Sequence, residues 1–321
     1  MKRVVVVGRR PPPVTGENLL TTKLGETLDE LGFRAEVRRR FDVRNLFICQ
    51  ATVWLVPGAK PFSFLRDLAF LALWRSTGNR VFCYLHNASR HRFLRFHSWL
   101  GFLKCDGVVF VVITPGHERE FAARGYRARV LRNAAADVTP VPATALAKRL
   151  FWCGVVSEEK GFRIAAEAFR ILWQRDPEWV FDVFGAGPLA DARSFPDVRF
   201  HGFAAGAEKV KAFAAGGVFI LPSAYEHETQ SLAVIEALGF GLPVIVSDAG
   251  ALPEMISGGA GPAGFALPIG SGASAYAEKV REIFDSYPQF SAAAAQHYAA
   301  KFSSAAYRET VASIMEASGA G

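Results

Sequence analysis

What the sequence lacks narrows the kinds of protein that it can encode. No uninterrupted apolar stretch in its 321 residues reaches the roughly 18–20 residues that a transmembrane helix needs. The opening sequence MKRVVVVGRRPPP places charge and proline around an apolar run that is too short for a secretory signal peptide. These two absences predict a cytoplasmic protein.

Cysteine is scarce, and its spacing matches no cofactor pattern. The four cysteines, Cys49, Cys83, Cys105 and Cys153, have neither the spacing of zinc ligands nor that of a secreted disulfide framework. They are expected to be buried thiols in a reducing compartment. The sequence D-x-D is also absent, and with it the usual carboxylate site for a metal that bridges a diphosphate. The sequence therefore predicts no metal and no other cofactor.

Positive charge is concentrated in the first half of the chain. Residues 1–150 hold 25 Lys and Arg against 11 Asp and Glu, whereas residues 151–321 hold 12 against 19. The first half carries a net charge of +14 and the second −7, which together give the net +7 of the chain. This distribution indicates an anionic partner for the first half.

Both halves alternate strand-like and helical segments. The apolar run MKRVVVVG precedes a helical segment that Gly32 ends, with Leu19, Leu20, Leu24, Leu28 and Leu31 at helical spacing. The loop between them is not G-x-G-x-x-G and contains three prolines, which disfavours a dinucleotide-binding loop. A second series begins after the linker VTPVPATALAK. The alternation predicts an α/β fold of two doubly wound parallel-sheet domains, residues 1–140 and 141–300, with a terminal helix in 301–321.

Residues 218–256 read as a strand, a polar loop, a helix and a buried strand. In open α/β sheets, ligands bind at loops that follow the carboxyl ends of strands. Glu228 falls in the loop and Glu236 in the apolar run LAVIEAL, where a half-buried carboxylate needs a partner. Taken alone, the two could also be a solvated loop charge and a helix-surface residue. Two acceptors spaced in this way suit a ligand with hydroxyl groups at both ends.

The same stretch resembles the E-x7-E signature of glycosyltransferase family 4, retaining sugar transferases of the GT-B fold, of the bacterial polysaccharide and glycolipid type. The matching positions are Pro222, Ser223, Glu236, Ala237, Gly241, Pro243, Ser247, Asp248, Pro253 and Glu254. The resemblance implies two Rossmann-like domains facing a cleft, the first on the acceptor side and the second for the nucleotide sugar. It implies a terminal helix that packs back on the first domain, a donor sugar beside Glu228, and ribose hydroxyls bound by Glu236.

Further site residues follow from the resemblance. His86, in YLHN at a strand end, matches a histidine that touches the donor sugar, although a structural role is the simpler interpretation of that residue alone. Gly16 matches the first-loop glycine that approaches the donor phosphates. The remaining donor-binding residues are expected at Gly187, Gly202, Phe203, Thr229, Gln230, Ser231 and Leu232.

The element GVVSEEKG resembles the phosphate-binding element of the family. Gly154 and Lys160 match, and Lys160 at a helix N-terminus can hold a diphosphate together with backbone N–H groups. Val155 stands where the family has an arginine, so one of two expected phosphate cations is missing. Arg9 and Arg10, at the mouth of the first strand, are candidates to replace it.

Residues 89–104, SRHRFLRFHSWLGFLK, interleave basic and aromatic side chains at helical spacing. One interpretation is a core helix whose polar face happens to be basic. The other is a surface helix lying on anionic lipid. The second predicts an anionic membrane surface as partner, on the inner face of the cell membrane, whereas no nucleic-acid recognition motif is present.

Together these features predict a retaining, metal-independent glycosyltransferase of the hexosyltransferase type. Its donor would be a nucleotide-diphosphate sugar and its acceptor a hydroxyl of a membrane-associated glycan or glycolipid. Lys160 and helix N-termini would stabilise the leaving diphosphate. Two alternatives remain open: a nucleotide-sugar epimerase of the same fold, and a non-catalytic protein that binds a nucleotide sugar or a lipid surface.

Overall fold

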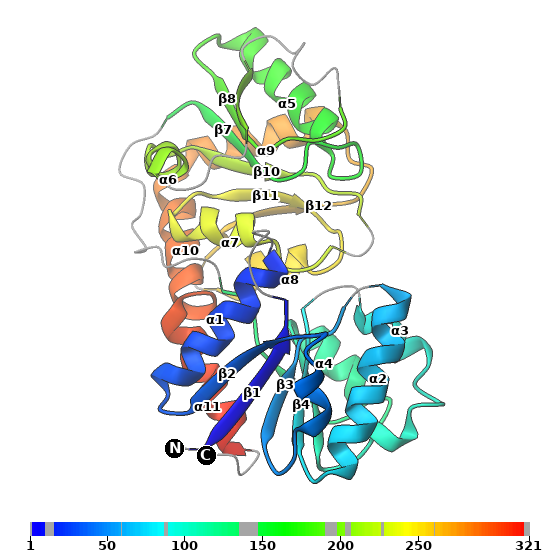
Figure 1. Ribbon diagram of the computed structural model, residues 1–321. Helices are drawn as coiled ribbons and strands as arrows, with labels where there is room; N and C mark the ends of the chain where they lie inside the picture. The colour runs from blue at the N-terminus through cyan, green and yellow to red at the C-terminus, as the bar shows by residue number, and fades with distance from the viewer. Residues whose placement is uncertain are drawn as a thin grey trace. The chain divides into compact units, whose positions relative to one another are not determined.

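The structure, a computed structural model, describes residues 2–9, 16–58, 60–86, 89–134, 147–189, 198–202, 207–225, 228–259 and 261–317. The chain divides into two compact units (Figure 1). Unit 1 comprises Met1–Ala134 with Ala305–Gly321, and unit 2 comprises Ala135–Ser304. The expected domain boundary at residues 140 and 141 lies outside the described residues.

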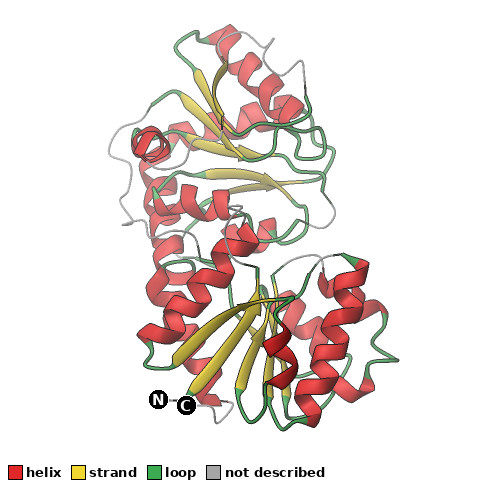
Figure 2. Cartoon of the chain, viewed as in Figure 1, coloured by secondary structure: helices red, strands yellow, loops and turns green. Residues whose placement is uncertain are grey.

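Unit 1 is a parallel sheet with helices along its faces (Figure 2). Its strands are β1 (Arg3–Gly8), β2 (Arg34–Arg39), β3 (Thr52–Leu55), β4 (Arg80–Leu85), β5 (Val108–Val112) and β6 (Ala128–Val130). Its helices are α1 (Gly16–Glu30), the 3-10 helix η1 (Val43–Phe47), α2 (Pro61–Ser76), α3 (Ser89–Arg95), the 3-10 helix η2 (Gly101–Leu103), α4 (Pro115–Ala122) and α11 (Ser304–Ala317).

The described strands of unit 1 pair in the order β2-β1-β3-β4-β5-β6. Val4, Val5, Val6 and Val7 of β1 are all 0% exposed, because helices cover both faces of the sheet. In α1, Leu20, Leu24 and Leu28 are buried as expected, whereas Leu19 is exposed. Gly16 is the first residue of this helix.

The single helix expected over residues 89–104 is wrong. Helix α3 ends at Arg95, turns follow, and η2 covers only Gly101–Leu103. The cause is tertiary packing: Phe93 is fully buried and meets the rings of Phe64 and Phe110 edge-on, at centroid distances of 5.0 and 5.2 Å. Phe93, Leu94, Leu100 and Leu103 of this segment therefore complete the core of unit 1, whereas Phe96 and Trp99 are exposed.

Unit 2 repeats the architecture with another parallel sheet. Its strands are β7 (Arg149–Cys153), β8 (Val180–Phe184), β9 (Val198–Gly202), β10 (Val218–Leu221), β11 (Val244–Ser247) and β12 (Gly264–Leu267). Its helices are α5 (Phe162–Arg175), α6 (Ala207–Ala214), α7 (Leu232–Gly239), α8 (Leu252–Ile256), α9 (Ala273–Asp285) and α10 (Tyr287–Lys301). In α5, buried Phe162, Ala165, Ala166 and Phe169 follow the helical period and form its core face.

The strand order of unit 2 fixes where a ligand can bind. The described strands run β12-β11-β10-β7-β8-β9, so the chain leaves the centre in one direction after β7 and in the other after β10. The loops that follow these two neighbours diverge at their carboxyl ends, which is the topological switch point of a doubly wound sheet. The predicted fold class, two doubly wound parallel α/β domains, is confirmed.

The expectation that all cysteines are buried thiols is wrong in part. All four are free, but only Cys83 is buried, while Cys49 is exposed and Cys105 and Cys153 are intermediate. Cys49 lies in the segment between η1 and β3. The apolar sequence of this segment predicts a strand, but in the structure it is a loop that joins the two elements. Among the described residues, no helix combines the length and the apolar character needed to cross a membrane.

Candidate functional site

The switch point of unit 2 brings two predicted site residues into direct contact. Lys160 lies in the loop after β7, immediately before the N-cap of α5, and Glu228 lies in the loop after β10. The Lys160 Nζ atom donates to Glu228 Oε2 at 2.7 Å. Residues 68 positions apart are thus joined at the sheet edge where open α/β folds bind ligands.

Glu228 is held in a buried polar environment. Its side chain is only 7% exposed, and its Oε2 atom also accepts a hydrogen bond of 2.7 Å from the hydroxyl of Ser223. Lys160 is 26% exposed and its ammonium lies 4.9 Å from the ring centroid of Tyr225. Burial, together with the charges of Glu159 and Glu228, raises the pKa of the Tyr225 hydroxyl above its usual value. The loop therefore presents a paired carboxylate and ammonium, both partly shielded from water.

Two glycines allow the loops around Glu228 to approach closely. Gly161 has a φ of 79°, and a Cβ atom there would lie 1.9 Å from the carbonyl oxygen of Pro222. Gly250 has a φ of 51°, and a Cβ atom there would lie 2.0 Å from the carbonyl oxygen of Glu228. The same carbonyl accepts a hydrogen bond from the N–H of Ala251 at 3.1 Å. Backbone packing from α5 and from the segment after β11 thus fixes the position of Glu228.

Glu236 lies inside α7, as expected, and its partner is Lys209 of α6. The two side chains are 20% and 17% exposed, and Lys209 Nζ donates to Glu236 Oε2 at 2.7 Å. Burial has the largest effect and by itself would lower the pKa of Lys209, but the charges of Glu236 and Cys153 and the hydrogen bond to Glu236 together raise it. Beside the pair, burial is the main cause that raises the pKa of the Cys153 thiol to about 11, which keeps it protonated at neutral pH. Nothing in the sequence had assigned a role to Lys209.

The other expected donor-binding residues of unit 2 surround the same sheet edge. Gly154 follows β7, Gly187 lies in the loop after β8, and Gly202 ends β9. Ser231 is the N-cap of α7 and Leu232 its first residue, so the first-turn N–H groups of this helix have no intrahelical acceptor. Thr229 is half-buried and Gln230 buried, both between Glu228 and this helix start. Phe203 lies outside the described residues.

The expected site residues of unit 1 lie at the carboxyl ends of its strands. His86 directly follows β4, is 5% exposed, and meets the ring of Tyr84 edge-on at 5.5 Å. The Tyr84 hydroxyl donates to Asn133 Oδ1 at 3.0 Å. Arg9 is exposed and directly follows β1, whereas Arg10 lies outside the described residues. Val155, where an arginine was expected, is 51% exposed.

Two residues of this region were missed by sequence reasoning. Ser223 was noted only as part of the resembling motif, although its position just after β10 could have suggested a polar contact in the loop. Lys209 stands in the short helical run EKVKAFAAG, which lies far from Glu236 in sequence and carries no local signal. In the part of the chain that the structure describes, no group of three or more His, Cys, Asp or Glu side chains could hold a metal ion.

Comparison with known proteins adds independent evidence. Residues 147–286 match the family model described as Glycosyl transferases group 1. The chain is similar to the sulfoquinovosyl transferase SQD2 of Arabidopsis thaliana, with 35% identity over 101 residues that cover 30% of this chain and 19% of that protein. It is also similar to the amylovoran biosynthesis glycosyltransferase AmsK of Erwinia amylovora, with 31% identity over 113 residues that cover 32% of this chain and 28% of that protein. The matches span less than a third of either relative.

The fold is similar to that of a solved structure over nearly the whole chain. The structure of HepE of Anabaena, solved in complex with UDP, aligns with this chain. The alignment covers 99% of this chain and 100% of the HepE chain, with a TM-score of 0.68 and 14% sequence identity. This likeness confirms the predicted fold, and the family match supports a glycosyltransferase. The chain therefore has the GT-B fold, and its residues 147–286 match the family model of group 1 glycosyltransferases.

Proposed function

We propose that the protein is a retaining glycosyltransferase that moves a sugar from a nucleotide-diphosphate sugar to a hydroxyl of a membrane-associated glycan or glycolipid. The observation that carries the proposal is the buried Glu228, bonded at 2.7 Å to both Lys160 and Ser223 at the switch point of unit 2. A buried carboxylate and a cation at that edge of the sheet are the groups that a sugar hydroxyl and a diphosphate require.

In this proposal Lys160 neutralises the leaving diphosphate. Its ammonium is 26% exposed and stands beside the start of α5, where backbone N–H groups and the helix dipole favour an anion. The start of α7, at Ser231 and Leu232, supplies a second set of such donors. Transfer from a diphosphate depends mainly on stabilising charge at the leaving oxygens. These groups would provide that stabilisation without a metal, and activity should survive excess chelator.

The two glutamates would bind the donor at its two ends. Glu228 Oε2 already accepts from Lys160 and Ser223, which leaves the other carboxylate oxygen to orient a sugar hydroxyl. Glu236 Oε2 accepts from Lys209, and its second oxygen would accept from the ribose. Gly154, Gly187, Gly202, Phe203, Thr229 and Gln230 would complete the donor site.

The names of similar proteins support the chemistry. The two curated relatives are named as a sulfoquinovosyl transferase and as a glycosyltransferase of amylovoran biosynthesis. HepE was solved with UDP bound. These names support sugar transfer as the reaction proposed for this chain.

The test is a thermal-shift screen of UDP, GDP, ADP and dTDP with their sugars, because a ligand that binds the native state raises the midpoint of unfolding. The donor found in this way is then offered with lipid-linked and soluble glycan acceptors, and the anomeric configuration of the product is read by NMR. Nucleotide binding without transfer would contradict the proposal. Conversion of the donor sugar without an acceptor would indicate an epimerase, and an inverted product would refute retention.

A further inference from the structure

Half of the large hydrophobic side chains that are exposed in the described residues lie in one short part of unit 1. Twelve such side chains are exposed, and six of them fall between residues 41 and 65. These six define the 41–65 surface: Phe41 (85% exposed), Val43 (70%), Leu46 (51%), Phe47 (80%), Phe62 (87%) and Leu65 (65%). Single exposed apolar residues are ordinary on a protein surface, but a cluster of this kind marks an interaction site.

The members of the 41–65 surface come from two elements that lie together. A hollow of about 370 Å³ is lined by Phe41, Val43 and Leu46 of the η1 region and by Phe62 and Phe70 of α2. Phe62 and Leu65 are three residues apart in the first turn of α2, so they share a face of that helix. Four of the six side chains, Phe41, Val43, Leu46 and Phe62, therefore line one hollow between η1 and α2.

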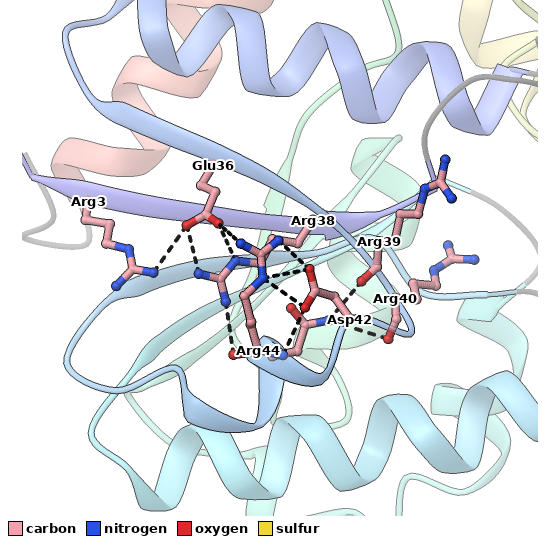
Figure 3. A network of polar contacts seen from close by, with 8 residues as sticks. Arg3, Glu36, Arg38, Arg39, Arg40, Asp42 and Arg44 are labelled. Atoms are coloured by element: carbon pink, nitrogen blue, oxygen red, sulfur yellow. Dashed lines mark hydrogen bonds and ion pairs between the residues drawn. The ribbon is translucent and has the colours of Figure 1, made fainter.

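Polar contacts hold the η1 region in place although its apolar side chains face outward. The Asp42 carboxylate caps η1 by accepting from the Arg44 N–H at 2.9 Å. The buried Asn45 donates to the carbonyl of Arg39 at 3.0 Å, and its own carbonyl accepts from the indole N–H of Trp74 at 2.7 Å. Figure 3 shows the ion pairs of Arg38 with Glu36 and of Arg44 with Asp42 in this region. The exposed aromatic side chains are thus carried by a segment whose backbone is held in place by hydrogen bonds.

The rim of the surface is basic. Residues 34–75 contain eight Lys and Arg but only three Asp and Glu, and these acids are engaged with arginines. Hydrogen bonds from Arg38 lower the pKa of Glu36 to about 2, and those from Arg44 lower that of Asp42 to about 2. Arg39 and Lys60 are exposed and make no ion pair among the described residues. The surface therefore joins an apolar centre to two positive charges, those of Arg39 and Lys60, that make no ion pair in the part of the chain that the structure describes.

We propose that the 41–65 surface docks unit 1 onto an anionic lipid bilayer, with its aromatic side chains inserted among the headgroups and Arg39 and Lys60 on lipid phosphates. Exposed aromatic and aliphatic side chains gain by entering the interface, and Lys or Arg beside them are attracted to anionic lipids. This inference rests on the proposed function, which includes the membrane-held acceptor. It goes further by assigning the surface of unit 1 that meets the membrane.

Charge argues against a second copy of the chain as the occupant. A two-fold interface places the same patch on both partners, so the basic rim of one copy would face the basic rim of the other, which is unfavourable. The segment 89–104 is a weaker candidate, because Phe93, Leu94, Leu100 and Leu103 are buried in unit 1. Its Phe96 and Trp99 are exposed, and Phe96 stacks on the buried Phe64 of α2 at 5.9 Å.

The experiment is flotation of the full chain with vesicles of phosphatidylcholine, alone or mixed with phosphatidylglycerol, at low and high salt. The wild type should float with the anionic vesicles at low salt and be released by high salt. The double variant Phe62→Ser and Leu65→Ser should lower the bound fraction at least about tenfold. The matched control is Ile269→Ser, which alters a 52% exposed residue of unit 2 and should leave binding unchanged. Because all three positions are exposed, each variant should keep the thermal midpoint of the wild type.

Several outcomes would overturn the inference. Absence of wild-type flotation on anionic vesicles at low salt would do so, as would equal binding by the double variant. Loss of binding only when Arg90, Arg92 and Arg95 become Glu would assign docking to α3 instead. A concentration-dependent dimer that the double variant dissociates would identify a second copy as the occupant. Transfer to a water-soluble acceptor should persist in the double variant, which separates failure of docking from failure of the proposed function.

Discussion

Replacing Glu228 by alanine tests the centre of the proposed site. The substitution removes the carboxylate that accepts from Lys160 and from Ser223, each at 2.7 Å. Ser223 keeps a possible acceptor, since its hydroxyl also lies 3.5 Å from the carbonyl oxygen of Glu159. Lys160 is 26% exposed and can turn toward water. The free energy of unfolding should therefore fall by only about 1–3 kcal/mol, which leaves a folded protein for assay.

Two functional effects of Glu228→Ala should separate. A sugar hydroxyl that loses a charged acceptor loses about 1.5–3 kcal/mol, which lowers kcat/KM by about 10–150-fold, and loss of sugar orientation should reduce transfer further, to background. Nucleoside diphosphate affinity should stay nearly intact, because Lys160 loses its competing carboxylate and its ammonium is released for the phosphates. A residue with a purely structural role would instead weaken nucleotide binding and transfer together.

The measurement pairs a transfer assay with calorimetric titration of the nucleoside diphosphate. Glu228→Gln serves as a second variant, because its amide oxygen can still accept from Lys160 and Ser223 while the charge is absent. The control is Glu278→Ala, which removes an exposed carboxylate from α9. Normal transfer by Glu228→Ala would refute the assignment of Glu228 to the donor sugar. Equal loss of transfer in Glu278→Ala would show that the assay reports stability rather than the site.

Three further predictions follow from other contacts. If Glu236 binds the ribose as proposed, Lys209→Met should weaken nucleoside diphosphate binding by about 1–3 kcal/mol because it leaves Glu236 without its cation. Lys209→Arg should restore most of the affinity in the same titration. Gly250→Ala should lower the free energy of unfolding by about 1–3 kcal/mol or more, measured in urea, because φ is 51° and the Cβ would meet the carbonyl of Glu228. The pKa values of Glu36 and Asp42 are lowered to about 2 in the folded protein, so the two ionised carboxylates stabilise the fold above the pKa range of free carboxyls. This contribution is lost as the pH falls toward 2. The thermal midpoint should therefore drop over this range, and it should drop less steeply in Glu36→Gln.

The part of the site that could be predicted from sequence is the part built from local elements. Glu228 and Glu236 were placed correctly in a loop and in the following helix, since a short apolar strand and an amphipathic run bracket them. Lys160 was expected at a helix start, and Gly161 is the N-cap of α5. Each of these positions depends on neighbouring residues, which a sequence window contains. Whether these residues bind a donor stays a prediction.

Contacts between distant segments could not be predicted. Lys209 pairs with Glu236 across 27 residues, and Lys160 pairs with Glu228 across 68. No periodicity reports such pairs. Lys160 and Glu228 meet because the sheet order brings the loops after β7 and β10 to adjacent strand ends. The half-buried Glu236 predicted that a partner must exist, but it could not identify which of the basic residues would supply it.

The expected membrane helix at 89–104 shows why exposure is the hardest property to infer. That segment and residues 41–65 both combine aromatic residues with arginine, and hydrophobic spacing alone favoured the first. Phe93 is fully buried because α3 packs against α2 and β5, whereas Phe62, one residue after the proline that begins α2, is 87% exposed. An aromatic ring in the middle of a helix that packs against other elements adds to the core. A ring in the first turn of a helix, at the end of the element, can face solvent. The docking that we propose for unit 1 on an anionic surface therefore rests on the start of α2 and on η1 rather than on α3.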